Sequence, residues 1–128
     1  MNSQIKIHNY KELKFWKTAF QVTLMVVKLS EKFPNKRVYW IIADQLIRAA
    51  SSVGANIAEG FGRYKGKEYQ RFIQVSLGSA NEVEYWLLVV KELSSNLGGE
   101  VDNILELNSQ TIKMLASTLK TLRNKNKD

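Results

Sequence analysis

The stretch QLIRAASSVGANIAEGFGRYKGKEYQR, from Gln45 to Arg71, decides the fold predicted for this chain. Its first part is so rich in Ala, Ser and Gly that a helix formed here would let a neighbouring backbone approach closely. Its second part is a turn punctuated by Gly60, Gly62 and Gly66 that carries lysine and arginine. A close-packed helix that leads into a basic turn indicates a rigid helical bundle that presents positive charge.

Apolar residues recur at intervals of three and four on both sides of this stretch, as one buried face of a helix requires. Pro34 and the Gly98-Gly99 pair separate the periodic segments. The pattern predicts four helices, over residues 10–33, 38–61, 67–94 and 101–123. Short connections between long helices favour antiparallel neighbours, so we expect an all-α, antiparallel up-down-up-down four-helix bundle that forms one domain over residues 1–128.

The same spacing predicts which positions face the core. In the first helix these are Leu13, Trp16, Phe20, Leu24 and Val27, and in the second they are Ile42, Leu46, Ala49, Val53 and Ile57. In the third they are Phe72, Ser76, Ser79, Val83, Leu87 and Val90. The fourth has a heptad seam of Val101, Leu105, Asn108, Ile112, Leu115, Leu119 and Leu122. Asn108, its polar member, either fixes the register of packing or faces the rim.

Three of the predicted helices carry a second apolar stripe beside the first. A helix that is apolar on two sides is buried on two sides, and large exposed apolar patches are uncommon on monomers. We therefore expect contact between subunits, although a wide core stripe is the alternative. The expected contact residues are Val22, Met25, Val26, Leu77, Tyr85, Leu88, Leu107 and Met114.

The composition argues against most kinds of catalytic and metal site. The chain has 128 residues, no cysteine and a single histidine, His8, which leaves no usual zinc site or catalytic triad. No apolar stretch approaches the ~20 residues of a membrane span, and the first residues lack the apolar core of a signal peptide. We expect a cytoplasmic, non-enzymatic protein with no catalytic residues, no metal, no cofactor and no membrane partner.

The net charge of +7 favours an anionic partner, and the expected topology concentrates that charge. One end of the bundle would collect twelve basic and four acidic residues, a balance of +8, and the rest of the chain holds seven basic and eight acidic residues, or −1. A solvated basic surface is the alternative. Tyr64 could stack on a base or pack against the bundle end. The predicted nucleic-acid-binding residues are Arg63, Tyr64, Lys65, Lys67, Arg71, Lys120, Arg123 and Lys125.

A polar stripe runs through the second and third predicted helices. Polar groups buried in a bundle must pair, because burying them unpaired is costly. The expected network comprises Arg48, Asn56, Glu59 and Glu82, with Arg48 paired to Glu82. A catalytic carboxylate pair is the functional alternative, and it is disfavoured because no nucleophile or metal ligand stands nearby in the sequence.

The quoted stretch and its continuation, KEYQRFIQVSLGSANEVE, resemble the 23S rRNA intervening-sequence protein family of small bacterial four-helix-bundle proteins. The earlier segment FWKTAFQVTLMVVKLSEKFP is similar to that family's first helix, so the resemblance covers about residues 10–95. The sequence departs from the family at Gly54, where proline is common, at Ile47, where arginine is common, and at Lys36-Arg37, a turn that is often acidic.

The resemblance implies a ring-like homopentamer with a basic surface that binds nucleic acid, because the family is related to the accessory protein of diversity-generating retroelements. We therefore expect a homo-oligomer, favouring a pentamer, that binds RNA rather than DNA through its basic end. The alternative is a protein-interaction scaffold or adaptor, for example for a reverse transcriptase, with no direct nucleic-acid role.

Overall fold

The computed structural model describes residues 7–62 and 66–127, and within them the chain is entirely helical. Four long helices, α1 (Lys14–Ser30), α2 (Arg37–Gly62), α3 (Gly66–Leu93) and α4 (Gly98–Lys125), form a bundle. Two single 3₁₀ turns, η1 (Tyr10–Glu12) and η2 (Ser95–Leu97), precede α1 and α4. The prediction of an all-α chain with four long helices is confirmed.

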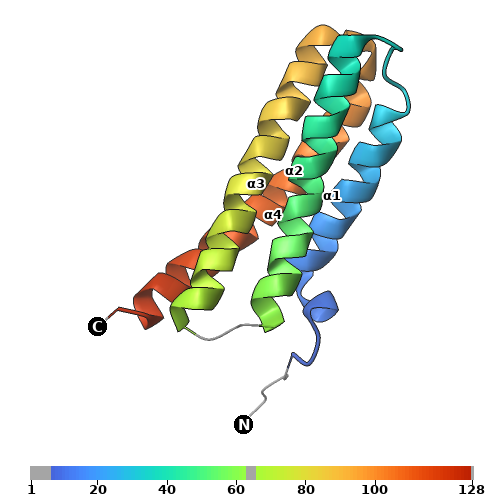
Figure 1. Cartoon of the computed structure of the whole chain (residues 1–128). Helices are drawn as coiled ribbons and strands as arrows, with labels where there is room; N and C mark the ends of the chain where they lie inside the picture. Colours follow the sequence, from blue (N-terminus) through green and yellow to red (C-terminus); the bar gives the residue numbers. More distant parts are fainter. Residues whose placement is uncertain (1–6, 63–65, 128) are drawn as a thin grey trace.

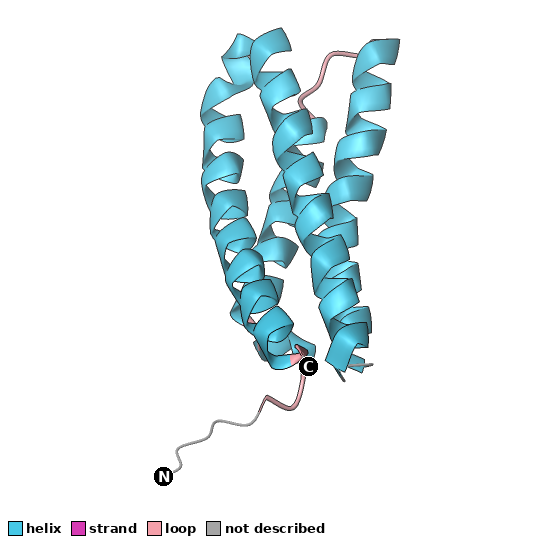
Figure 2. Cartoon of the chain, turned by 90° about the vertical axis from the view of Figure 1, so that its left-hand side faces the viewer, coloured by secondary structure: helices cyan, strands magenta, loops and turns pink. Residues whose placement is uncertain are grey.

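Each helix packs against its neighbours in the sequence, and α1 also packs against α4. In Figure 1, the start of α1, the end of α2, the start of α3 and the end of α4 lie at the lower end of the bundle. The α1–α2 and α3–α4 connections lie at the upper end. Figure 2, turned by a quarter, shows the helices still side by side along one long axis. We call these the lower end and the upper end.

The helix boundaries differ from the predicted ones at the first and last helices. Leu13 has an extended backbone, which separates η1 from α1, and α1 stops at Ser30 instead of residue 33. The residue before a proline is disfavoured in α-helical conformation, so Phe33 cannot continue the helix toward Pro34. At the other end, α4 already begins at Gly98 and continues to Lys125.

The core confirms the predicted face of α2, since Ile42, Leu46, Ala49, Val53 and Ile57 are all buried. The predicted face of α1 is wrong at three positions. Phe20, Leu24 and Val27 are 48%, 41% and 37% exposed. The buried residues of α1 are Phe15, Ala19, Val22, Val26 and Leu29. On α1, Lys14, Lys17, Gln21 and Lys28 occupy one narrow polar stripe, and apolar residues fill most of the remaining surface. Periodicity alone therefore cannot select which part of the apolar surface is buried.

The prediction that Val22 and Val26 contact another subunit is therefore wrong, because these side chains are 2% and 0% exposed inside the bundle. Met25, Leu77, Leu107 and Met114 are half-buried and pack against the core. Only Tyr85 and Leu88 of the predicted contact residues are openly exposed, at 59% and 49%.

Hydrogen bonds between helices hold the small polar residues of the core. Asn108 is buried and its side-chain amide donates to the carbonyl oxygen of Ala80 at 3.0 Å, so it links α4 to α3 instead of facing the rim. The hydroxyl of Ser76 donates to the carbonyl oxygen of Val53 at 3.0 Å. Each buried polar group of the described residues has a partner, as stable packing requires.

Candidate nucleic-acid interface

At the lower end of the bundle, α3 begins at a glycine whose backbone conformation is unfavourable for residues with a side chain. Gly66 has a φ of +57°, a left-handed conformation that glycine adopts without strain, and α3 starts from it. Lys67 and Arg71 follow in the first two turns and are both exposed. Four residues apart, they lie on the same side of the helix.

Arg71 is held by two contacts on its own helix. Its Nη2 atom lies 3.3 Å from Oε2 of Glu68, and its guanidinium lies 5.1 Å from the centre of the Phe72 ring. Both partners of the ion pair are about half exposed or more, so the pair contributes little to stability. The guanidinium is therefore oriented without being removed from water.

The end of α4 lies against the start of α3. The side-chain amide of Asn126 donates to Oε1 of Gln70 at 2.8 Å, and this bond joins the two helix ends. Arg123 and Lys125 occupy the last turn of α4, where positive charge is favoured by the partial negative charge of the helix C-terminus. Lys120 lies one turn earlier and is also exposed. The bond thus brings two basic segments together that are about fifty residues apart in the chain.

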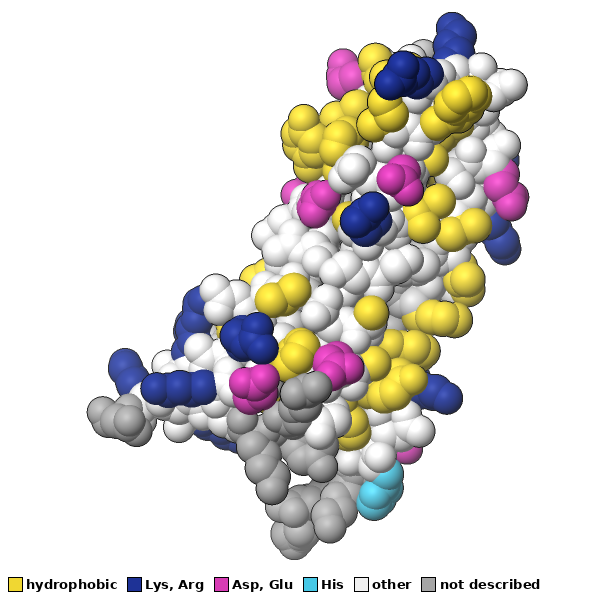
Figure 3. Space-filling view, viewed as in Figure 1, with side chains coloured by type: hydrophobic (Ala, Val, Ile, Leu, Met, Phe, Trp, Pro, Cys, Tyr) yellow, Lys and Arg dark blue, Asp and Glu magenta, His cyan; other side chains and the backbone are white. Residues whose placement is uncertain are grey.

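Charge differs sharply along the bundle. Among the described residues, the lower end carries nine basic residues (Lys11, Lys14, Lys17, Lys67, Arg71, Lys120, Arg123, Lys125, Lys127) and three acidic ones (Glu12, Glu59, Glu68), a balance of +6. The remaining seven basic and eight acidic residues give −1. In Figure 3, several Lys and Arg side chains gather at the lower left, where α3 begins and α4 ends.

Lys67 and Arg71 lie in the first two turns of α3, and Lys120, Arg123 and Lys125 lie in the last turns of α4. The predicted contacts of Arg63, Tyr64 and Lys65 lie outside the described residues. The Asn126–Gln70 bond was not predicted, since two uncharged residues in different helices give no sequence signal. Below this surface, burial raises the pKa of the half-buried Tyr69, so its hydroxyl stays neutral at physiological pH.

The predicted polar network is wrong in its central pair. Arg48 is exposed and its closest carboxylate is Asp44 on the same helix, with Nη2 and Oδ2 3.9 Å apart. Glu82 instead accepts a hydrogen bond from the indole of Trp86 at 3.4 Å. Asn56 does take part in a polar contact, because its amide donates to the hydroxyl of Ser52, which is 2.9 Å from the hydroxyl of Ser79.

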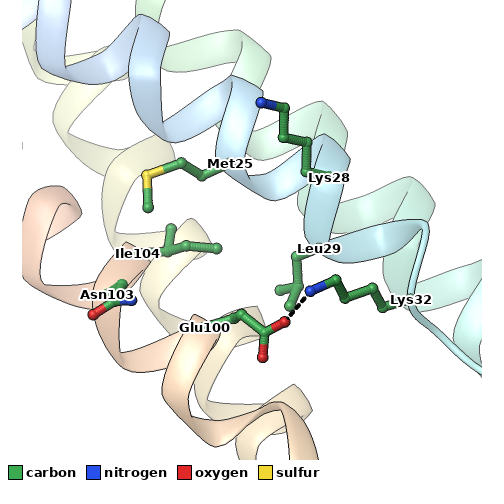
Figure 4. Close-up of a pocket in the computed structure, with 7 residues that line it drawn as sticks. All are labelled: Met25, Lys28, Leu29, Lys32, Glu100, Asn103 and Ile104. Atoms are coloured by element: carbon green, nitrogen blue, oxygen red, sulfur yellow. Dashed lines mark hydrogen bonds and ion pairs between the residues drawn. The ribbon is translucent and has the colours of Figure 1, made fainter.

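A second candidate site is a small apolar cavity of about 170 Å³ between α1 and α4 near the upper end. Met25, Leu29 and Ile104 line it, and the ion pair between Lys32 and Glu100 lies at its edge (Figure 4). Ligand pockets usually exceed ~300 Å³, so this hollow is small for a substrate. Within residues 7–62 and 66–127, no three His, Asp or Glu side chains are grouped as metal ligands would be.

No helix among the described residues is both long enough and apolar enough to cross a membrane.

Comparison with known proteins places the fold. No curated protein matches the chain. A crystal structure of a protein of unknown function from the S23 ribosomal protein family of Bacteroides thetaiotaomicron is similar, with a TM-score of 0.76 and 23% identity. The similarity covers 83% of this chain and 98% of that one. The family model for the 23S rRNA-intervening sequence protein matches residues 11–117, and the chain therefore belongs to the 23S rRNA-intervening sequence protein family.

Proposed function

We propose that this chain is a non-enzymatic, cytoplasmic protein that binds nucleic acid, RNA in preference to DNA, through its lower end. The proposal includes an up-down-up-down bundle that assembles as a homo-oligomer, with five subunits favoured. The observation that carries it is the separation of charge along the bundle. Nine basic residues against three acidic ones at the lower end of the described chain produce a field that attracts polyanions.

The state of these cations supports the proposal. Of the five predicted binding residues that the structure describes, only Arg71 forms an ion pair with another described residue. Lys67, Lys120, Arg123 and Lys125 are exposed. Exposed lysine and arginine side chains that contact phosphates displace the counterions condensed on the nucleic acid, and the release of these ions drives binding.

The family supports the choice of ligand. Its description refers to intervening sequences of 23S rRNA, and the similar structure comes from a family described as ribosomal. RNA is thus the nucleic acid to test first.

The test compares two variants. One lacks three cations of the lower end, and the other, as a control, lacks three cations of the upper end. The variant Lys67→Ala/Arg71→Ala/Arg123→Ala and the control Lys32→Ala/Lys36→Ala/Arg37→Ala both lower the net charge from +7 to +4. Binding of a structured RNA is measured by fluorescence anisotropy across a salt series. Each lost phosphate contact should flatten the slope of log K against log[salt] by about 0.7–0.9.

We expect the lower-end variant to bind more weakly and to show a slope smaller by about two units, while the control keeps the slope of the unchanged protein. Equal losses in both variants would mean that net charge, and not the lower end, determines binding. A duplex DNA of the same length, measured in parallel, tests the preference for RNA.

A further inference from the structure

An exposed apolar surface runs along α1 on the side that faces α2. Phe20, Leu24 and Val27 are 48%, 41% and 37% exposed, and no charged residue interrupts them. Beside them lies a shallow groove whose α2 wall is made of small residues, Ser51, Gly54, Ala55 and Ala58. The Phe20 ring stacks on Trp16 at 5.0 Å, so the aromatic pair has a defined position at the groove's edge.

A second surface lies on the outer side of α3. It has a gap at a glycine, whereas the first surface has a projecting aromatic ring. Val75, Gly78, Glu82 and Tyr85 follow at steps of three, four and three, which places them on one stripe of the helix. Val75 and Tyr85 are 42% and 59% exposed. A Cβ added at Gly78 would meet nothing within 4 Å. Glycine is unfavourable inside a helix, and no neighbour within the described chain requires it there. A glycine in this position leaves a gap into which another molecule can pack.

The two surfaces lie at the same height of the bundle. The Thr23 hydroxyl donates to the carbonyl oxygen of Ala50, and Ser52 and Ser79 share a hydrogen bond. Phe20 lies three residues below Thr23, and at about 1.5 Å per residue it is level with Gly78 to within roughly one helical turn. The projecting ring and the glycine gap are therefore in register.

Charge is complementary as well. Lys17 and Lys28 flank the exposed residues of α1. Between Arg71 and Lys91, α3 carries no basic residue, and the carboxylate of Glu82 belongs to the stripe itself. Opposite charges on two surfaces favour their association.

We propose that the α1–α2 surface of one copy packs against the outer stripe of α3 in a second copy, with Phe20 over Gly78. This inference rests on the homo-oligomer of the proposed function and names its contact surfaces. The two surfaces belong to α1 and α3, which do not contact each other within the bundle. Each copy can therefore contact one neighbour through its α1–α2 surface and a second neighbour through its α3 surface. Such a contact repeats head to tail, and where the rotation between neighbouring copies closes it forms a ring in which all copies point the same way. All basic lower ends then meet on one face of the ring.

The absence of cysteine makes this contact directly testable by cross-linking. The double variant Phe20→Cys/Gly78→Cys, oxidised in solution, should form a ladder of covalent oligomers in denaturing electrophoresis, whereas each single variant stays at 14.7 kDa. The control Phe20→Cys/Lys113→Cys, with its second cysteine exposed on α4, should also stay at monomer size. Dimers from a single variant, or no ladder from the double variant, overturn the proposal.

A size-exclusion and light-scattering series provides a second test. Gly78→Leu fills the gap and should lower the association constant at least about tenfold, and Phe20→Glu should do the same. Gly99→Leu, at an exposed glycine with equally open surroundings, should leave the mass unchanged. Circular dichroism confirms folding of each variant. The proposal is overturned if neither Gly78→Leu nor Phe20→Glu lowers the mass of the assembly, or if the protein without substitutions is a monomer. In either case the surface does not bind a second copy, and a different protein becomes the candidate partner.

The outcomes separate this inference from the proposed function. A monomeric chain that still binds RNA through its lower end contradicts only the contact. A fully assembled ring that cannot bind RNA contradicts only the nucleic-acid role.

Discussion

The two ends of the bundle satisfy their charged and polar groups in different ways. At the upper end, Lys32 pairs with Glu100, Lys91 lies 2.7 Å from Asp102, and the buried hydroxyls of Tyr39 and Ser94 bond to each other at 2.5 Å. At the lower end, the described cations outnumber the acids three to one. Contacts between charged or polar side chains thus join different elements at the upper end, whereas the lower end carries an excess of positive charge.

This difference indicates a division of roles. The upper-end contacts connect α1 with α4, α3 with α4, and α2 with the segment after α3, so they hold the connections in place. At the lower end, α2 and α3 pack closely at Gly60, and an uncharged hydrogen bond from Asn126 to Gln70 joins α4 to α3. Neither of these contacts uses a lower-end cation.

The largest expected effect tests the close packing of the lower end. A Cβ at Gly60 would lie 2.6 Å from Cβ of Phe72, closer than atoms of two packed helices can approach. We expect Gly60→Ala to destabilise the protein by about 1–3 kcal/mol, measured by urea denaturation, because α2 and α3 must move apart. The control Gly62→Ala, where nothing lies within 4 Å, should change stability little. Equal stability of both variants would mean that the crossing is loose.

The next effect concerns the upper end. Tyr39→Phe removes a buried hydroxyl and leaves that of Ser94 without its partner, so we expect a loss of about 1–2 kcal/mol. Thermal and urea denaturation measure it. In the double variant Tyr39→Phe/Ser94→Ala no buried hydroxyl is left unpaired, and we expect part of the loss to be recovered. A double variant less stable than Tyr39→Phe would rule out this explanation.

A smaller effect distinguishes the ends by their response to salt. Lower-end cations repel one another, and ions screen that repulsion within about 10 Å at 0.1 M. Raising sodium chloride from 50 to 500 mM should therefore stabilise the unchanged protein by roughly 0.5 kcal/mol. The variant Lys67→Ala/Arg71→Ala/Arg123→Ala should respond less, and the upper-end control with the same net charge should respond as the unchanged protein does. If the unchanged protein and both variants respond equally to salt, repulsion between the lower-end cations does not affect stability.

The smallest effect is a pH dependence from the upper end. The hydrogen bond and charge of Lys32 lower the pKa of Glu100. A carboxylate whose pKa is lower in the folded state stabilises the fold above its unfolded pKa, near 4.3 for glutamate. That contribution is lost as pH falls through the folded value. Glu100→Gln should therefore reduce the fall in stability as the pH drops below about 4.3. An unchanged acid profile would show that the pair contributes nothing in solution.

The sequence predicted α2 better than α1 for a physical reason. On α2 the side opposite the core carries Asp44, Arg48 and Ser51, so only one stripe can be buried. On α1, the polar stripe of Lys14, Lys17, Gln21 and Lys28 is narrow, and apolar side chains occupy a broad surface on both sides of it. The residues that distinguish the true core face are Thr18 and Thr23, whose hydroxyls reach Thr111 and the Ala50 carbonyl. These contacts exist only once α2 and α4 are in place, so no property of α1 alone identifies them.

The candidate surface was predictable in part. Because helix number and connection length follow from periodicity and from Pro34 and the glycine pair, the sequence could place Lys67, Arg71 and the last lysines at one end. It could not predict which apolar residues stay exposed. The sequence predicted that Val22 and Val26 would lie on the outer surface of α1. In the structure these two are buried, and Phe20, Leu24 and Val27 are exposed instead.

By itself the sequence determined the number of helices, the core of α2 and the charge carried by each segment, since these depend on local spacing and composition. Only the tertiary structure decided which side of α1 is buried, which cations are paired, and that Gly78 opens outward at the height of Phe20. Burial and pairing depend on contacts between helices. They are fixed only when the four helices pack together, because the rotation of each helix about its axis then decides which side chains face its neighbours.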